Sequence, residues 1–405
     1  MGDHLRTGGE RLTSMQEAQI TATLRHRPRI EVVRVGDEHA ESLVEFFEAI
    51  WSRKTSAESI RADRAAAAAA NPVEPGADIP AFVYLSDGKV LGYISTIPAR
   101  FWNGVTAYPG HWFIGFMVLP EFRGGPVGHA VLKEAIRQLG LIAGMVVALP
   151  PRRLFKALGF NDYGAISNYL TLIRPARVFG ALDLEALGMS SVPGWAVRLL
   201  RLAQRTGIAT AAGLVGGGAL VAWRTAVEGN GKVTLREETP ARSELDTLWN
   251  QVRARLAGAS VRDGWYFPWR YGSSQGGKYV FIAARDGKEL AGVAIVRRPR
   301  DEGDPRLSGI KVATLSDILF SPERRDVALG LLAAAERAAH SMGADALLCT
   351  ASHPAITSLL PRRAYVKLPG NVHFLVRDVK DAHAMPKALT EWWLMRGDAN
   401  ADEVF

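Results

Sequence analysis

Val118-Leu119-Pro120-Glu121-Phe122-Arg123-Gly124-Gly125-Pro126-Val127-Gly128-His129 is the stretch that decides the fold of this 405-residue chain. An apolar run, residues 113–119, leads into it, and a helix-like pattern, residues 127–139, leads out of it. A glycine-rich turn that opens a helix presents backbone N–H groups and the positive end of the helix dipole. The stretch therefore predicts a binding site for an anionic group such as a phosphate.

The turn resembles the acyl-CoA pyrophosphate loop of the GNAT acetyltransferase superfamily. Arg123 and Gly128 stand at the first and last positions of that signature, and Pro126 stands where its first glycine is expected. A prolyl nitrogen carries no proton, so the loop loses one donor there. A helix start that carries glycines for close packing is the alternative. The resemblance implies an acetyl-CoA or other acyl-CoA site formed by Val118, Arg123, Gly124, Gly125, Val127, Gly128 and His129.

An internal repeat supports this interpretation. Asp87-Gly88 lies between two apolar runs, and Asp286-Gly287 repeats the arrangement; Asp-Gly between apolar runs predicts a β-hairpin. Further matches lie at nearly the same spacing: Pro120, Arg123 and Gly128 recur 202 residues later as Pro322, Arg325 and Gly330. One long-period repeat indicates two copies of a domain.

The expected order in the first copy is similar to that of a GNAT domain. It comprises a strand (30–35), a helix (37–51), the hairpin, a central strand (112–119), a helix (127–139), a strand (145–149), a short helix (152–158) and a strand (167–173). The fold class is therefore expected to be α/β with a mixed sheet, as two tandem GNAT-like domains joined by a helical connector. The expected parts are a flexible tail (1–29), the domain with the acyl-CoA loop (30–175), the connector (176–232), a degenerate domain (233–380) and a C-terminal tail (381–405).

The second copy is expected to hold no coenzyme. It keeps Arg325 and Gly330 at the ends of the loop but has no glycine between them. Asp326 would also place a carboxylate beside the phosphates, which repels them.

The resemblance implies direct transfer of an acyl group from the thioester to an amine, with a base for the ammonium proton and an acid for the leaving thiolate. The family's usual acid, a tyrosine, is replaced by Phe155, which cannot donate a proton. Tyr163 is the candidate replacement because it is expected to lie outside the strand core; a tyrosine without a catalytic role is the alternative. The candidate base is His111, with Glu121 behind it.

An aromatic and basic cluster at residues 262–271 precedes the second hairpin. Its guanidiniums and rings suit sugars, carboxylates or phosphates, and an aromatic plug is the alternative. With the tail 392–398, the cluster looks like segments of tandem GNAT proteins from bacterial polysaccharide-related gene neighbourhoods. The acceptor is therefore expected to be an amine on a small or saccharide-like molecule, bound by Arg262, Trp269, Arg270 and Tyr271.

Composition limits the partners. The formal charge of +8 comes from scattered Lys and Arg, so nucleic acid is not expected, and the histidines and the single cysteine form no short-spaced metal set. Cys349 is expected to be a buried strand thiol. The polar residues 1–29 lack the apolar core of a secretory signal, which indicates the cytoplasm. Residues 196–223 combine a basic amphipathic segment with an uncharged run, so peripheral contact with a membrane is left open beside packing between domains.

The sequence thus favours an acyl-CoA-dependent N-acyltransferase, an N-acetyltransferase first of all. Two alternatives remain. Pro126 and Phe155 together suit a catalytically inactive acyl-CoA-binding or scaffold protein. An aminoacyl transferase of the peptidoglycan-bridge type also pairs two GNAT domains, but a coiled-coil arm and a dense basic patch would be expected for it. The acyl length is not specified by the sequence.

Overall fold

The computed structural model describes residues 28–404, except for residues 53, 147, 184–193, 229–232, 301–306 and 379–382. By its internal contacts the chain forms two compact units. The first consists of Met1–Asp63, Pro80–Ile94 and Gly115–Ala135, and the second of Arg64–Ile79, Ser95–Ile114 and Ile136–Phe405. The predicted tail, 1–29, lies almost entirely outside the described residues, and the predicted domain limits stay predictions.

The first unit contains the predicted Asp-Gly hairpin. Asp87 and Gly88 both have positive φ, 49° and 80°, the conformation that a two-residue turn needs. Ser42 accepts a hydrogen bond through Oγ from the Val90 N–H at 2.9 Å, which fixes the first helix on this hairpin. The elements here are β1 (Ile30–Arg34), η1 (Asp37–His39), α2 (Ala40–Trp51), the start of α3 (Ala57–Ala69), β2 (Ala81–Ser86), the start of β3 (Lys89–Trp102), the end of β4 (Ala107–Val118), η2 (Pro120–Phe122) and most of α4 (Pro126–Gln138).

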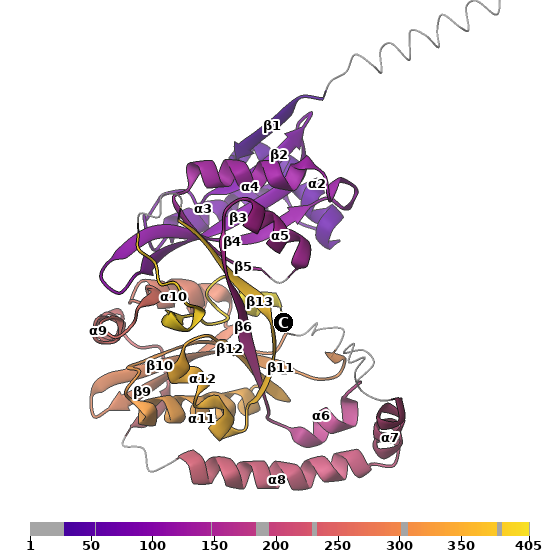
Figure 1. Ribbon diagram of the computed structural model, residues 1–405, viewed down its shortest axis with the longest axis vertical. Helices are drawn as coiled ribbons and strands as arrows, with labels where there is room; N and C mark the ends of the chain where they lie inside the picture. The colour runs from indigo at the N-terminus through magenta and orange to yellow at the C-terminus, as the bar shows by residue number, and fades with distance from the viewer. Residues whose placement is uncertain are drawn as a thin grey trace, which may run out of the picture. The chain divides into compact units, whose positions relative to one another are not determined.

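The second unit contains the rest of the chain (Figure 1). Its first part, after the other segments of α3, β3 and β4, consists of β5 (Leu141–Val146), α5 (Leu149–Ala157), β6 (Asn161–Leu172), α6 (Pro175–Ala181), α7 (Gly194–Arg205) and α8 (Ile208–Glu228). Its later part consists of β7 (Thr234–Glu237), α9 (Arg242–Arg253), β8 (Gly258–Ser260), α10 (Tyr266–Tyr271), η3 (Ser273–Gln275), β9 (Tyr279–Asp286), β10 (Glu289–Arg297), β11 (Val312–Phe320), α11 (Arg325–Ser341), β12 (Ala346–Ala351), α12 (Pro354–Thr357), η5 (Leu360–Arg363), β13 (Val366–Asp378), η6 (Leu389–Glu391), β14 (Trp392–Trp393) and η7 (Ala401–Val404).

The sheet of the second unit contains an exchange of strands. Its order is β4-β5-β13-β6-β12-β11-β10-β9-β7, so β13 from the later part lies between β5 and β6. In return β6 pairs with β12, where Leu172 lies opposite Ala346. All three new pairings, β5 with β13, β13 with β6 and β6 with β12, are antiparallel. From β4 to β11 the order is symmetrical about the β13-β6 pair, as a duplicated domain predicts.

Packing repeats in the same way. A Cβ on Gly92, in β3, would lie 2.6 Å from Cγ1 of Val127, and a Cβ on Gly292, in β10, would lie 2.7 Å from Cγ1 of Val327. Real Cβ atoms do not approach so closely, so both strands need glycine where the helix valine sits on them. The same glycine-valine contact therefore fixes α4 in the first unit and α11 in the second.

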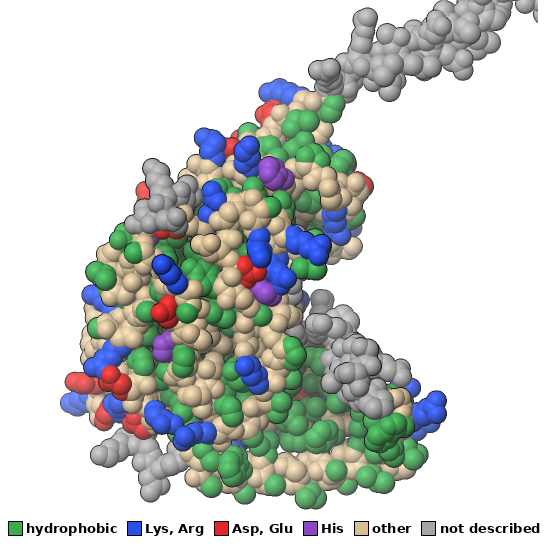
Figure 2. Space-filling model, viewed as in Figure 1, with side chains coloured by type: hydrophobic (Ala, Val, Ile, Leu, Met, Phe, Trp, Pro, Cys, Tyr) green, Lys and Arg blue, Asp and Glu red, His purple; other side chains and the backbone are tan. Residues whose placement is uncertain are grey.

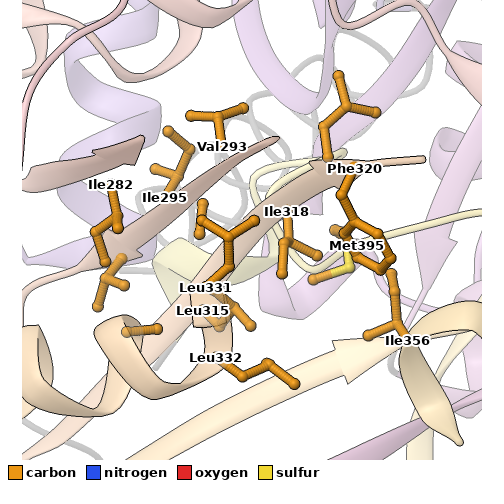
Figure 3. Packing of buried hydrophobic residues seen from close by; sticks show 14 of the residues in the cluster. Ile282, Val293, Ile295, Leu315, Ile318, Phe320, Leu331, Leu332, Ile356 and Met395 are labelled. Carbon is orange, nitrogen blue, oxygen red and sulfur yellow. The ribbon is translucent and has the colours of Figure 1, made fainter. Parts of the chain in front are cut away.

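The largest core lies in the later part of the chain. Leu331 and Leu332 of α11 pack with side chains of β9, β10 and β11 (Figure 3). Most of the other residues of α11 on this side are alanines, which let the helix lie close to the sheet. Cys349 is fully buried in β12, as predicted, and burial raises the pKa of its thiol to about 12.

Three predicted strand limits were wrong. The central strand, β4, begins at Ala107 rather than at residue 112. β5 covers Leu141–Val146 rather than 145–149, because the buried run begins directly after the turn at Gly140. β6 begins at Asn161, directly after Gly159 ends α5 with a φ of 84°. Tyr163 is therefore inside a strand rather than outside the strand core.

Candidate active site

The Gly-rich turn lies in the first unit and is exposed from Glu121 to Pro126. Gly124 has a φ of 81°, which favours glycine, and the Arg123 side chain donates through Nε to the Val118 carbonyl at 3.1 Å. The Gly125 N–H donates to the Phe122 carbonyl at 3.3 Å, so this expected donor is already used inside the turn.

The remaining donors belong to the first turn of α4, which begins at Pro126. Helix residues in the first turn have no partner within the helix for their N–H groups, so Val127, Gly128 and His129 present theirs at the helix start. These N–H groups lie at the positive end of a 13-residue helix. Arg123 and His129 are exposed beside them. The turn therefore has the geometry of an anion site despite Pro126.

β4 and β5 pair only briefly in the second unit. Their parallel pairing joins residues 111–113 to 142–144, with Phe113 and Gly144 as its last pair. β5 nevertheless continues to pair on its other side with β13 as far as Val146. Two residues beyond Phe113, β4 carries Gly115 with a φ of 60°, which interrupts regular strand geometry. The central strand thus has backbone groups beyond Phe113 that do not pair with β5.

Phe155 lies at this last pair. It is buried, its ring packs on Phe160 at 4.8 Å, and a Cβ on Gly144 would be 3.7 Å from its Cε1. Tyr163 packs instead on Phe374, which lies opposite Met145, the next residue of β5. Neighbouring residues of a strand point to opposite faces. Phe155 and Tyr163 therefore lie on opposite faces of the sheet.

The candidate bases lie apart in the structure. His111 is half-buried in β4, lies opposite Ile142 and has the same strand parity as Phe113, so it shares the face of Phe155. Glu121 is exposed in η2, which belongs to the first unit.

A cluster that sequence reasoning missed lies beside the end of β5. His373 of β13 lies opposite Val146, and its Nδ1 is 3.0 Å from Oδ1 of Asp162 in β6. Arg152 of α5 contacts the Nε2 side of the same ring. Burial raises the pKa of Asp162, but hydrogen bonds from His373 and the Gly164 N–H outweigh this and hold it below its usual value. Asp162 and His373 are 211 residues apart, so no local pattern could have joined them.

The corresponding helix start in the second copy is already occupied. Asp326 stands in the first turn of α11, and Arg324 donates to both of its carboxylate oxygens, at 3.0 and 2.9 Å. These hydrogen bonds, with the backbone N–H of Val327, lower the pKa of Asp326. The chain's own carboxylate thus takes the position that a phosphate would need.

The corresponding strand ends in the second copy hold the C-terminal segment. Trp393 donates through Nε1 to the Ile318 carbonyl of β11 at 2.9 Å, and the Gly397 N–H donates to the Ser316 carbonyl at 2.8 Å. On the other side Met395 forms a bridge with Ala351 at the end of β12. Residues 392–398 therefore lie between the ends of β11 and β12, and we name them the C-terminal plug.

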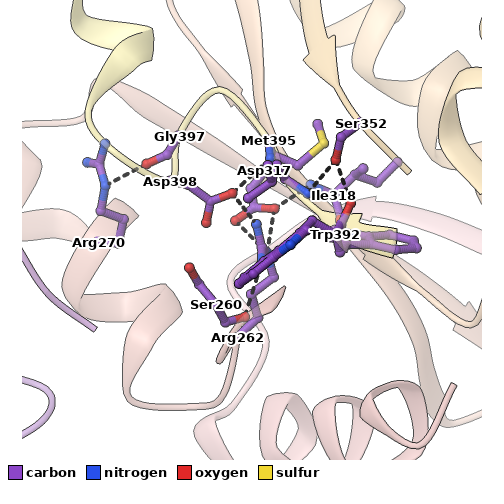
Figure 4. Close-up of polar contacts among 12 residues, drawn as sticks. Ser260, Arg262, Arg270, Asp317, Ile318, Ser352, Trp392, Met395, Gly397 and Asp398 are labelled. Atoms are coloured by element: carbon purple, nitrogen blue, oxygen red, sulfur yellow. Dashed lines mark hydrogen bonds and ion pairs between the residues drawn. The ribbon is translucent and has the colours of Figure 1, made fainter. Parts of the chain in front are cut away.

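Three of the four expected acceptor residues lie at this plug, and two of them, Arg262 and Arg270, donate to it directly (Figure 4). Arg262 is fully buried and donates to Asp317 at 2.9 Å and to Asp398 at 2.8 Å. The Tyr271 hydroxyl donates to Asp317 at 3.1 Å. Burial raises the pKa of Asp317 to about 6, and Arg262 limits the rise.

Arg270 is also buried. Its guanidinium donates to the Gly397 carbonyl at 3.2 Å and to Asp402 at 3.0 Å. The placement of Arg262, Arg270 and Tyr271 favours the packing role that the sequence had left as the alternative.

Trp269 alone of the four lines a cavity, of about 490 Å³. Arg242 places its guanidinium 4.3 Å from the ring centre of Trp265, which is 53% exposed. The cavity thus combines two indole rings, one cation and small polar groups; its lining includes Ala69, Ala70, Asn71, Pro75, Thr239, Pro268, Gly272 and Ser274. Sequence reasoning found Trp269 but missed Arg242, which lies 23 residues before Trp265. Within the described ranges of the chain, no group of acidic, histidine or cysteine side chains has the geometry of a metal site.

Comparison with known proteins finds similar sequences and folds. Residues 38–160 match the Acetyltransferase (GNAT) family. A probable N-acyltransferase from Enterococcus faecalis V583 has a similar structure, with a TM-score of 0.54 and 12% identity over 89% of this chain and 75% of that chain. A GCN5-related N-acetyltransferase from Anabaena variabilis gives a TM-score of 0.53 and 12% identity, over 87% and 73%.

An N-myristoyltransferase from Saccharomyces cerevisiae, solved with bound myristoyl-CoA, gives a TM-score of 0.53 and 11% identity, over 87% of this chain and 84% of that chain. No curated protein matches the sequence. At these identities the likeness shows the fold, and the predicted α/β class with a mixed, GNAT-like sheet is confirmed. What the comparisons show is a match to the GNAT acetyltransferase family over residues 38–160 and a GNAT-like fold.

Proposed function

We propose that this protein is an acyl-CoA-dependent N-acyltransferase that transfers an acetyl or longer acyl group to an amine. The observation that carries the proposal is the exposed, glycine-rich turn at residues 121–126 directly before α4, where the N–H groups of Val127, Gly128 and His129 have no partner within the helix. The family match of residues 38–160 supports the same chemistry. The yeast N-myristoyltransferase of similar fold holds myristoyl-CoA, which supports an acyl-CoA as donor.

Backbone groups of β4 would stabilise the reaction. The thioester carbonyl gains negative charge when an amine attacks it, and a fixed N–H that donates to this oxygen lowers the barrier. The stretch of β4 beyond Phe113, which does not pair with β5, is where we place this donor. We propose His111, which lies on the same face of the sheet as Phe155, as the base. Phe155 stands where the family has its tyrosine acid, and it cannot donate a proton.

The cavity beside Trp265 is the proposed acceptor site. Indole faces stack on sugar rings or other flat groups, and the Arg242 guanidinium suits a carboxylate or phosphate. This composition supports a small or saccharide-like amine as acceptor. Because Arg262 and Arg270 are buried in ion pairs, the proposed acceptor contacts are now Arg242, Trp265 and Trp269.

Two measurements test the function. Isothermal titration calorimetry should detect binding of acetyl-CoA or of a longer acyl-CoA to the protein. Release of CoA should then be measured with a panel of amino sugars and small amines as acceptors. Arg242→Ala should raise the KM of the acceptor and leave acyl-CoA affinity unchanged. Arg253→Ala is the matched control, because that guanidinium also lies over an indole, that of Trp102, without lining the cavity.

A second candidate, an acyl-CoA-binding protein without turnover, is favoured by the buried Phe155. It predicts acyl-CoA binding without CoA release for every amine. Absence of acyl-CoA binding would contradict both candidates.

A further inference from the structure

We propose that α7 and α8 form a surface that binds an anionic lipid bilayer. The proposal starts from the outer side of α7. Trp195, Leu199 and Leu202 follow one another at positions i, i+4 and i+7, so they form one stripe along the helix. They are 67%, 56% and 59% exposed. Figure 2 shows hydrophobic side chains gathered over these two helices at the lower edge of the view.

A row of positive charge lies beside this stripe. Arg198 and Arg205 lie seven residues apart, about a quarter turn around the helix from the leucines, and Arg201 between them also lines a small cavity with Asp183. The third side of α7 faces the protein, where Gln204 donates through Nε2 to the carbonyls of Phe179 at 3.0 Å and Leu182 at 2.9 Å. α7 therefore presents a hydrophobic stripe and a basic row outward while its inner side is fixed.

α8 continues the hydrophobic surface. Its inner side is fixed by Gly213, where a Cβ would lie 2.5 Å from Cα of Ala176, and by Arg224, which lies 3.3 Å from Glu336 and donates to the Leu172 carbonyl. Its large outward side chains are all more than half exposed: Ile208, Leu214, Val215, Val221 and Trp223. Residues 194–227 contain no Asp, Glu or Lys. A helix face that contacts water is normally polar, so this apolar face suits contact with an apolar partner or with a lipid bilayer.

The surface suits contact with the face of a bilayer. No single described helix is long and apolar enough to cross a membrane, although α7 and α8 together, bent by 87°, meet the length and composition of a span. Because Gln204 and Arg224 hold the inner sides of both helices to the protein, only the outer sides are available. The indole of Trp195 and the arginines beside the leucines are the groups that interfacial helices place at lipid headgroups.

Charge distinguishes lipid from a second copy of the chain. A symmetric dimer through this surface would bring the arginine row of one copy toward that of the other, whereas anionic headgroups attract it. The bilayer is therefore the occupant we propose.

The test is flotation of the full-length protein with vesicles of phosphatidylcholine, with and without phosphatidylglycerol, at low and high salt. We expect binding to the anionic vesicles that weakens with salt. Leu199→Ser with Leu202→Ser should weaken binding about tenfold or more, because two leucines that would be buried in the bilayer are lost. Arg198→Gln with Arg205→Gln should weaken binding about 10- to 30-fold and reduce its salt dependence.

The control is Val105→Ser, which removes an 82% exposed valine outside this surface and should bind as the unchanged protein does. Thermal melting checks that each variant is folded. The proposal fails if the unchanged protein does not float with anionic vesicles, or if the leucine variant floats equally well. It also fails if the leucine variant abolishes a dimer seen in solution while vesicle binding is absent.

Discussion

The start of α4 and the start of α11 are related by the internal repeat, but one is open and the other is filled. At α4 the turn at residues 121–126 is exposed, whereas at α11 Asp326 stands in the first turn of the helix and is held by Arg324. The strand ends differ as well, since the C-terminal plug lies between the ends of β11 and β12. Two helix starts of similar sequence can therefore differ through their local side chains alone.

The largest effect should come from removal of the plug's main anchor. Arg262→Ala leaves Asp317 and Asp398 buried without their cation, which costs about 3–5 kcal/mol of unfolding free energy. Arg324→Ala, which breaks an exposed ion pair at α11, should cost about 1 kcal/mol or less. Chemical denaturation of both variants measures the difference. Equal, small losses would show that the plug does not stabilise the second copy.

A single substitution should give the start of α4 the carboxylate that the start of α11 has. Gly124 and Asp326 correspond in the repeat, and Gly124→Asp should weaken acyl-CoA binding about 10- to 100-fold through repulsion of the phosphates. Gly124→Asn is the control for backbone strain, because it has the same shape without the charge. Asp326→Gly should create no second site, since the plug remains. Calorimetry that finds two coenzyme sites in Asp326→Gly would contradict this account.

Phe155→Tyr would sharpen the comparison with the family. The new hydroxyl lies at the last pair of β4 and β5 and restores a proton donor there, so we expect kcat to be kept or to rise about tenfold or more. Tyr163 lies on the other face of the sheet, so Tyr163→Phe should lower kcat only if groups on that face take part in catalysis. Single-turnover kinetics of CoA release measure both. A fall in kcat for Phe155→Tyr at unchanged stability would mean that the pocket requires phenylalanine.

The smallest expected effect is on pH dependence. The pKa of Asp317 is raised from 3.8 to about 6 in the folded protein, so the folded state takes up a proton before the unfolded chain does as the pH falls. This contribution to unfolding free energy is therefore greatest at low pH and is lost as the pH rises from about 4 to about 6. Asp317→Asn should remove it, and denaturation at several pH values should show a changed slope within that window. If the pH dependence of the unfolding free energy is the same in Asp317→Asn, the proton taken up on folding is not bound by Asp317.

The sequence predicted features whose cause is local. Asp87-Gly88 fixes a hairpin through its own backbone, and the Gly-rich turn opens α4 as expected. The C-terminal plug and the β5-β13 pairing could not be predicted, because nothing near Trp393 or His373 specifies a partner more than 70 residues away. For the same reason Arg262 was expected at a ligand, since its two carboxylate partners lie 55 and 136 residues further along the chain.

The exchanged strands have a consequence for synthesis of the chain. β5 is complete once residue 146 has emerged from the ribosome, but β13, which covers one of its edges, ends only at residue 378. During that interval the edge of β5 has no partner, and unpaired strand edges recruit other strands. The two copies therefore cannot be expressed as independent halves, and slow translation should increase the nascent chain's dependence on chaperones.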